Sequence, residues 1–120
     1  MRGAKPYRIQ EFLTAEGKSL FREWLDQLDL AVKVRIQARV LRFEAGNLGD
    51  HKSVGTGIYE SRIDFGPGYR LYFGIVGTER ILLLCGGVKG SQQRDIKRAR
   101  DLWQDYRRRG RHGKARNGLE

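Results

Sequence analysis

Two segments of alternating apolar and polar residues, joined by a Gly-Pro-Gly turn, occupy residues 57–77, GIYESRIDFGPGYRLYFGIVG. Alternation with a period of two is typical of β-strands, and a short glycine-containing turn between two such segments predicts an antiparallel hairpin. This hairpin lies in the middle of a short chain, where both of its faces could carry hydrophobic side chains. Instead, charged residues stand at alternate positions within it, namely Glu60, Arg62, Asp64 and Arg70.

The period of two assigns these side chains to faces of the hairpin. Glu60 and Arg62 share a face in the first strand, and Arg70 and Tyr72 share one in the second. Pairing across the turn is expected to bring Arg62 and Arg70 onto one surface. Glu60 and Tyr72 would lie beside them. A solvated sheet face with surface ion pairs is the alternative interpretation.

The segment before the hairpin predicts one strand and two helices. Residues 7–13 alternate loosely and form the strand. Ser19 is suited to cap a first helix, and Asp29 to cap a second helix over residues 30–45, where apolar residues recur at helical spacing. The two helices are expected to form a hairpin.

The segment after the hairpin predicts a strand and a final helix. Residues 80–87, RILLLCGG, are apolar at consecutive positions, as in an inner strand covered on both faces. Ser91 is suited to cap a helix whose apolar stripe ends at Tyr106. With hairpin strands at residues 57–64 and 69–76, the order is β-α-α-β-β-β-α. This predicts an α+β domain with a small antiparallel-rich sheet, an N-terminal helical hairpin and a C-terminal helix.

The chain is short and strongly basic. Its 120 residues suit one domain, and 24 Lys and Arg against 14 Asp and Glu give a net charge of +10. Such an excess favours a polyanionic partner, most often nucleic acid, over a generically basic soluble protein. The lone Cys85, in an apolar segment, is expected to be a buried free thiol in a reducing compartment. No apolar segment is long enough for a membrane span, so a cytoplasmic location without membrane contact is expected.

The basic excess is concentrated at the C-terminal end. Residues 94–120 contain ten basic and four acidic side chains, and the final residues are rich in Gly and Arg with few large apolar side chains. This composition is typical of a disordered segment. We therefore expect a single domain over residues 1–106 and a basic disordered tail over residues 107–120.

A glycine-rich loop between the last strand and the last helix, CGGVKGSQQRD at residues 85–95, suggests an anion site. It brings Lys89 and the amides of Gln92 and Gln93 close to a helix N-terminus, where backbone N–H groups favour negative charge. An ordinary strand–helix loop is the alternative. Together with the two hairpin arginines, the loop describes a cationic cleft for phosphate.

No metal or cofactor is expected from the sequence. His51 is expected in a loop and His112 in the tail, and no Cys/His pairs have the spacing of metal ligands. Asp101 and Asp105 are spaced to pair with neighbouring arginines on the last helix.

The segments GIYESRIDFGPGYRLYF, LLLCGG and KGSQQRDIKRA, preceded by the helical hairpin, resemble the RelE/ParE superfamily of bacterial toxins over residues 6–106. Within it, the chain is most similar to the phage-derived Gp49-like or HigB-type group of addiction module killer proteins. The resemblance implies a RelE-like fold and a toxin held inactive by a small antitoxin with a helix-turn-helix domain. RelE-type members cleave mRNA in the ribosomal A site, whereas ParE-type members inhibit DNA gyrase.

The resemblance also implies roles for individual residues. Arg70 matches the arginine that RelE-type nucleases carry in this strand, Arg62 matches a basic residue of the preceding strand, and Lys89 corresponds to a cation after the last strand. Two positions depart from the pattern. Glu60 stands where RelE has a lysine, and the C-terminal catalytic tyrosine or histidine has no equivalent.

The resulting hypothesis is a toxin that acts as a ribosome-dependent, metal-independent endoribonuclease. Arg70 and Arg62 would stabilise the transition state with help from Lys89, and Glu60 is the candidate base unless it forms an ion pair with Arg62. Tyr72 or Tyr69 would stack on a base or belong to the core. The expected RNA-binding residues are Gln92, Gln93, Arg94, Tyr72 and Lys52.

Two alternatives stay open: a ParE-like toxin that inhibits gyrase by binding, and a non-catalytic basic module that binds nucleic acid. The expected partners of the toxin are a cognate antitoxin and mRNA on the ribosome.

Overall fold

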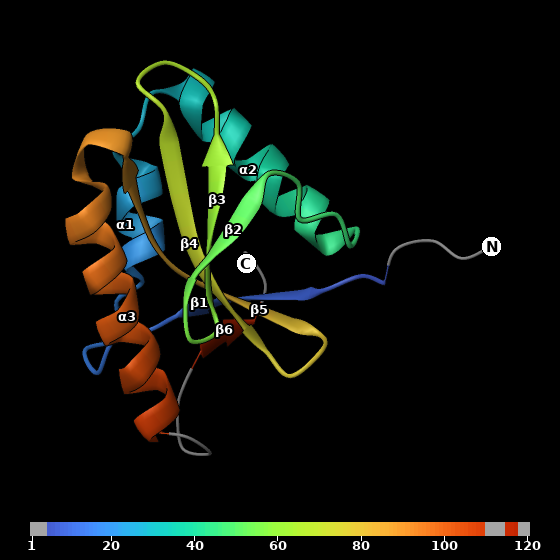
Figure 1. Cartoon of the computed structure of the whole chain (residues 1–120), viewed down its shortest axis with the longest axis vertical. Coiled ribbons are helices and arrows are strands. Elements are labelled where there is room, and N and C mark those ends of the chain that lie inside the picture. The colour runs from blue at the N-terminus through green and yellow to red at the C-terminus, as the bar shows by residue number, and fades with distance from the viewer. Residues whose placement is uncertain (1–4, 110–114, 118–120) are drawn as a thin grey trace.

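A mixed β-sheet forms the centre of the protein, and helices pack on both of its faces (Figure 1). The structure is a computed structural model that describes residues 5–109 and 115–117. The strand order in the sheet is β2-β3-β4-β5-β1-β6. All neighbouring strands are antiparallel except β1 and β5, which are parallel. The strands are β1 (Arg8–Phe12), β2 (His51–Gly55), β3 (Ile58–Ile63), β4 (Tyr69–Val76), β5 (Arg80–Val88) and β6 (Ala115–Asn117).

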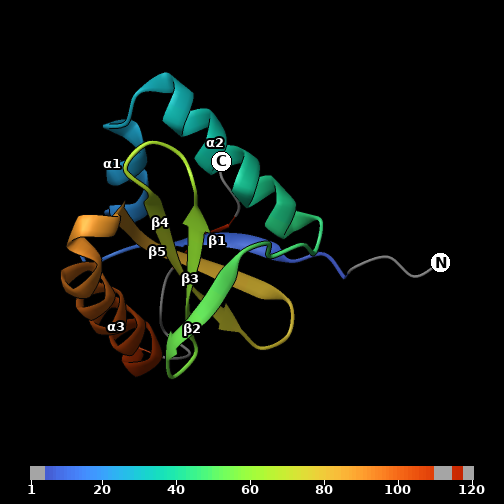
Figure 2. The same cartoon turned by 45° about the horizontal axis from the view of Figure 1, so that its top comes forward.

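Three α-helices and one short 3-10 helix accompany the sheet. They are α1 (Leu20–Asp26), α2 (Leu30–Glu44), η1 (Lys89–Ser91) and α3 (Gln92–Arg109). Helices α1 and α2 pack on one face, and α3 packs on the other (Figure 2). The predicted α+β class and the order of the predicted elements are therefore confirmed. The Ser19 side chain caps α1 by accepting a 3.0 Å hydrogen bond from the Arg22 backbone N–H. Asp29 occupies the N-cap of α2, but its side chain makes no capping hydrogen bond.

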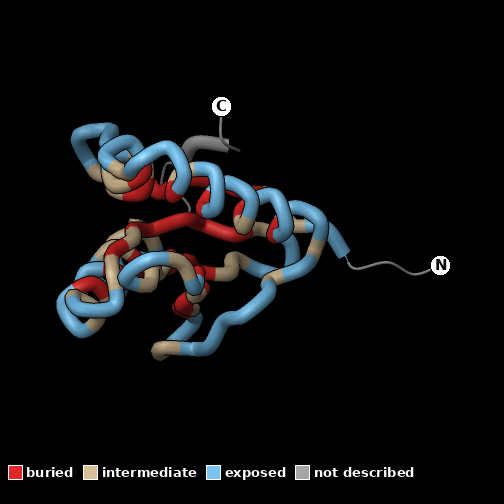
Figure 3. Tube along the Cα trace, turned by 90° about the horizontal axis from the view of Figure 1, so that it is seen from above, coloured by how far each residue is buried: buried red, intermediate tan, exposed pale blue. Residues whose placement is uncertain are grey.

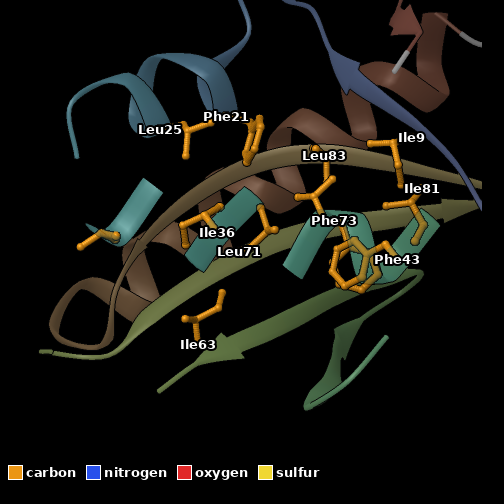
Figure 4. Packing of buried hydrophobic residues seen from close by; sticks show 12 residues of the cluster. Ile9, Phe21, Leu25, Ile36, Phe43, Ile63, Leu71, Phe73, Ile81 and Leu83 are labelled. Carbon is orange, nitrogen blue, oxygen red and sulfur yellow. The ribbon is translucent and has the colours of Figure 1, made fainter. Parts of the chain in front are cut away.

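The hydrophobic core consists of two clusters, one on each face of the sheet. Under α1 and α2, Phe43 and Phe73 pack with ring centroids 4.9 Å apart (Figure 4). Under α3, Trp103 lies with Tyr72 and Leu82. The central strand β5 contributes side chains to both clusters, which explains its consecutive apolar residues. Its predicted role as an inner strand covered on both faces is confirmed.

The edge strand β2 was not predicted from the sequence. His51, expected in a loop, is the first residue of this strand and pairs with Ser61 of β3. The segment HKSVG has a mostly exposed and polar surface, so it lacks the apolar alternation that identifies a strand. Backbone pairing with β3 makes it a strand, and the sheet gains an edge beside the hairpin.

The C-terminal segment also differs from expectation. Residues 107–109 continue α3, although we expected the disordered tail to begin at residue 107. Arg109 stabilises this last turn, because it donates a 2.9 Å hydrogen bond to the Leu13 carbonyl and pairs with Asp105. Strand β6 then pairs with β1. The rest of the expected tail lies outside the described residues. It comprises residues 110–114, which include His112, and residues 118–120.

Within residues 5–109 and 115–117, no helix combines the length and the apolar character needed to cross a membrane.

Candidate functional site

The two hairpin arginines face each other across the strand pair β3–β4. Arg62 is paired directly with Arg70 in the antiparallel register, so both side chains point to the same face of the sheet. They line a cleft of about 300 Å³ at the end of the hairpin, beside the turn. The residues that line the cleft are Asp50, Arg62, Ile63, Asp64, Gly66, Pro67, Gly68, Arg70 and Lys89.

The turn between β3 and β4 brings Lys89 to the arginines. The Gly68 N–H donates to the Phe65 carbonyl at 3.0 Å, and the Gly68 carbonyl accepts a 3.0 Å hydrogen bond from the Lys89 backbone N–H. Gly66 and Gly68 have φ angles of 57° and 86°, a region that favours glycine. On its other side, the turn is supported by the Arg35 guanidinium, which stacks 3.9 Å above the Phe65 ring. The turn therefore joins the hairpin to the end of β5 by backbone contacts.

Positive charge in this cleft is only partly neutralised. Arg62 forms an ion pair with Asp50 at 3.6 Å, and that carboxylate is 63% exposed. The side chains of Arg70 and Lys89 make no hydrogen bond or ion pair with any other described residue. The Nε atoms of Arg62 and Arg70 are buried and also lack a partner within the described part of the chain. Guanidinium groups with unused donors are suited to bind phosphate, because their fork matches two phosphate oxygens.

Glu60 lies outside the cleft, in a buried position that does not fit the expected role of a base. Its side chain is fully buried, since α3 covers this face of the hairpin. One carboxylate oxygen, Oε2, accepts hydrogen bonds from the Tyr72 hydroxyl at 3.0 Å and from Gln92 Nε2 at 2.6 Å. The alternative ion pair with Arg62 is not formed either, because Arg62 pairs with Asp50. A carboxylate enclosed in this way cannot contact an RNA hydroxyl.

The ring of Tyr72 is not accessible for base stacking, and the side chain of Tyr69 is covered in part. Tyr72 is fully buried under α3, and this burial, followed by the charge of Glu60, raises the pKa of its hydroxyl above the ordinary value. Tyr69 is half-buried against the cluster under α1 and α2. Of the two interpretations of these aromatic side chains, the core role is the one that the structure supports. The sequence pattern missed this burial because it assigned no cover to the face of Glu60 and Tyr72.

A second hollow continues from the cleft to the start of α3. It is lined by residues 88–94 and shares Lys89 with the first cleft. Gln93 and Arg94 are exposed there, whereas the Gln92 amide is engaged by Glu60. Lys52 is exposed on β2 directly opposite Glu60 and lines neither hollow. Arg62 and Arg70 thus line the first cleft, Gln93 and Arg94 line the second hollow, and Lys89 lines both. Lys52, Glu60 and Tyr72 line neither.

The start of α3 is held close to β5 by Asp95. The Ser91 hydroxyl donates to the Asp95 carboxylate. Ser91, which was expected to cap the last helix, is the final residue of η1 and bonds a side chain in the first turn of α3. A Cβ atom at Gly87 would stand 1.8 Å from Asp95 Oδ2, so only glycine allows this close approach. Gly87, the second glycine of the CGG segment, therefore allows the first turn of α3 to lie close to β5.

Two acidic residues of the cleft were not recognised as site residues from the sequence. Asp50 precedes the unpredicted strand β2, and its backbone carbonyl accepts a 3.0 Å hydrogen bond from the Arg62 N–H. No local pattern identifies it, because the β2–β3 pairing alone brings it to Arg62. Asp64 begins the turn, is exposed and forms no ion pair with other residues that the structure describes. The feature of the sequence that could have identified Asp64 as a site residue is its position directly after strand β3, where the turn begins.

The site is built from cations, amides and two carboxylates. Among the described residues, no three His, Cys, Asp or Glu side chains gather in a way that could hold a metal ion.

Comparison with known proteins was made by sequence, by family model and by solved structure. A protein of Haemophilus influenzae is 48% identical over 86 residues, which cover 71% of this chain and 87% of that protein. It is described only as an uncharacterized protein. No family model matches the chain, and no solved structure matches it.

Proposed function

The chain belongs to the same family as the Haemophilus influenzae protein, and we propose that it is the toxin of a type II toxin–antitoxin system. In this proposal it inhibits translation by cleaving mRNA on the ribosome, as a metal-independent endoribonuclease with a RelE-like fold. The observation that carries the proposal is the cleft at the end of the hairpin. There Arg62, Arg70 and Lys89 converge, and the last two have no counter-ion among the described residues.

The proposed reaction is transesterification of RNA. The 2′-oxygen forms a bond to the adjacent phosphorus, the bond to the 5′-oxygen breaks, and the products are a 2′,3′-cyclic phosphate and a 5′-hydroxyl. The step needs an acceptor for the 2′-proton, cations for the negative phosphorane and a proton for the departing 5′-oxygen. Arg62 and Arg70 meet the second need, since each remains charged and can bind two phosphate oxygens. Lys89 contributes a further positive charge to the same phosphate.

Asp64 takes the role of proton acceptor that the buried Glu60 cannot fill. It lines the cleft, is exposed and has no ion-pair partner among the described residues, whereas Asp50 is paired with Arg62. Among the described residues that line the cleft, none is a histidine, tyrosine or cysteine that could act as a strong general acid. Water would therefore protonate the leaving oxygen. Such a site depends on its partner to hold the RNA in the reactive geometry, so we expect little cleavage of free RNA and efficient cleavage on ribosomes.

Substitution of Arg70 tests the proposal. Arg70→Ala should lower mRNA cleavage on ribosomes by about 10²-fold or more and abolish growth inhibition, because a transition-state contact is lost. The matched control is Arg80→Ala, at the opposite end of β5 and in a different hollow. Circular dichroism and thermal unfolding would establish that both variants fold. A folded Arg70→Ala protein with full toxicity would contradict the nuclease proposal.

The phenotype separates this function from the other candidates. Cut messages and arrested translation support the nuclease. A DNA-damage response with gyrase-linked breaks would instead assign ParE-type inhibition by binding. Nucleic-acid binding without toxicity would assign a basic binding module, whose affinity would fall steeply with salt.

The proposed partner of the toxin is a cognate antitoxin with a helix-turn-helix domain. An acidic antitoxin segment over the cationic cleft would keep mRNA from Arg70 and Lys89 by charge neutralisation and by steric exclusion.

A further inference from the structure

One face of α2 carries an apolar stripe that the fold does not use. The large hydrophobic residues that are exposed in the described part of the chain are Leu30, Val34 and Leu41, with 76%, 54% and 61% of their surface accessible. At 100° per residue, their spacing puts all three on one line along the helix. Ala31 and Ala38 widen the stripe and are exposed too.

Core packing does not explain this stripe. The opposite side of α2 supplies the core with Val32, Ile36, Val40 and Phe43, all buried. Figure 3 shows the two sides of the helix, with buried positions toward the sheet and exposed positions on the outer surface. An amphipathic surface helix normally has one apolar face, and α2 has two. Single exposed apolar residues scattered over a surface are normal, whereas several gathered on one face are typical of an interaction surface.

The borders of the stripe are basic. Lys33, Arg35 and Arg42 flank it, with Glu44 as a single acidic residue at its end. Arg35 is held over Phe65, and neither Lys33 nor Arg42 forms an ion pair within residues 5–109 and 115–117. A partner that covers the apolar stripe would therefore gain most by presenting carboxylates on both sides of its own apolar face.

We propose that the outer face of α2 binds an acidic amphipathic helix of a partner protein. Leu30, Val34, Gln37 and Leu41 follow the 4-3-4 spacing of a coiled-coil seam, which favours a helical occupant. The stripe extends over three helical turns, or about 16 Å. A partner helix of similar length fits it.

Charge argues against the other occupants. A second copy of the chain would bring Lys33 and Arg42 close to the same cations, on molecules that each carry a net charge of +10. A membrane-binding helix typically inserts Trp and Phe as well as Leu, and the stripe has no aromatic side chain. The surface is also separate from the cleft, which is built from the hairpin and the end of β5. The inference therefore does not depend on the proposed nuclease function.

Binding of designed peptides to the full chain tests the inference. The probe is a fluorescent helical peptide of about four turns, with Leu at the seam positions and Glu beside them. Its control has the same composition in scrambled order. We expect the amphipathic peptide to bind and the scrambled peptide not to bind, although their charges are equal.

Variants of α2 locate the binding site. Val34→Ser combined with Leu41→Ser should weaken binding by about tenfold or more, whereas the matched control Gln104→Ser on the exposed face of α3 should not change it. Lys33→Glu combined with Arg42→Glu should reverse the preference toward a peptide with Lys in place of Glu. These positions are not buried, so the fold should be retained.

Three outcomes would overturn the inference. The first is equal binding of the scrambled peptide, and the second is unchanged binding by the Val34→Ser, Leu41→Ser protein. The third is evidence that something else occupies the stripe. This would be self-association of the chain, or its binding to anionic phospholipid vesicles, if either is lost in the Val34→Ser, Leu41→Ser protein.

Discussion

Gln92, at the start of α3, donates a 2.6 Å hydrogen bond to the carboxylate of Glu60 on β3, and that carboxylate has no exposed surface. The bond ties the last helix to the central hairpin. It also divides the charged residues of the hairpin into two groups. Glu60 is enclosed between sheet and helix, whereas Arg62 and Arg70 lie two pairs further along on the same face, where the cleft opens.

The buried carboxylate should be important for stability. Glu60→Ala leaves the Tyr72 hydroxyl and the Gln92 amide without their acceptor and creates a cavity, so we expect a loss of about 2–4 kcal/mol in the free energy of unfolding. Glu60→Gln preserves the shape and one acceptor oxygen and should lose less. Urea denaturation measures the loss in each variant, provided that the dependence of the free energy of unfolding on urea concentration is unchanged. Equal losses in the two variants would contradict the role of the acceptor oxygen.

The arginine pair should dominate the binding of single-stranded RNA. Each phosphate contact to a single strand contributes about 0.7 to the slope of log affinity against log salt. Arg62→Ala and Arg70→Ala should therefore each reduce the slope by about that amount, and Arg80→Ala should leave it unchanged. Fluorescence anisotropy with a short RNA at several salt concentrations gives the slopes. Identical slopes in all three variants would show that the RNA binds elsewhere.

Close packing at Gly86 predicts a site that does not tolerate a methyl group. A Cβ there would lie 2.3 Å from Trp24 Cε3, between an inner strand and the half-buried indole. Gly86→Ala should destabilise the protein by about 1–3 kcal/mol through overpacking. At Gly90, a Cβ would meet no atom within 4 Å. Gly90→Ala is therefore the matched control and should be neutral, and thermal unfolding of the two variants makes the comparison.

Alkaline pH should weaken the fold through Cys85. Burial, with a further contribution from the Asp95 carboxylate, raises the pKa of this thiol from 9.0 to about 12. The unfolded chain therefore loses the thiol proton first, so the contribution of Cys85 to stability is constant below about pH 9 and falls between pH 9 and 12. The slope in that window is at most about 1.4 kcal/mol per pH unit.

Removal of the thiol isolates this effect. The Cys85→Ala variant should lose less stability between pH 8 and pH 10 than the unsubstituted protein, as measured by urea denaturation. Part of the alkaline loss should remain, because the pKa of Tyr72 is raised by burial as well. Equal losses in the two proteins would contradict the assignment to Cys85.

Local chemistry made much of the fold predictable. The period of two in residues 57–77 identified the hairpin, and the consecutive apolar residues of β5 identified a strand covered on both faces. The position of Ser19 identified the start of α1. These signals depend on neighbours in the chain, so they can be read without knowledge of the tertiary structure.

Features that depend on segments distant in the chain could not be predicted. Strand β2 has no apolar alternation and is defined by its pairing with β3. Asp50 reaches Arg62 only through that pairing. Likewise, the sequence indicated that Glu60 and Tyr72 share a face but not that α3 covers it.

The amino-acid sequence by itself determined the central hairpin, the alternation of its faces and the placement of Arg62 and Arg70 on one surface, because each follows from contacts near in the chain. Only the tertiary structure decided which charges meet solvent. Packing of α3 enclosed Glu60 and left Arg70 and Lys89 at an open cleft, since burial depends on which distant segment lies above a side chain.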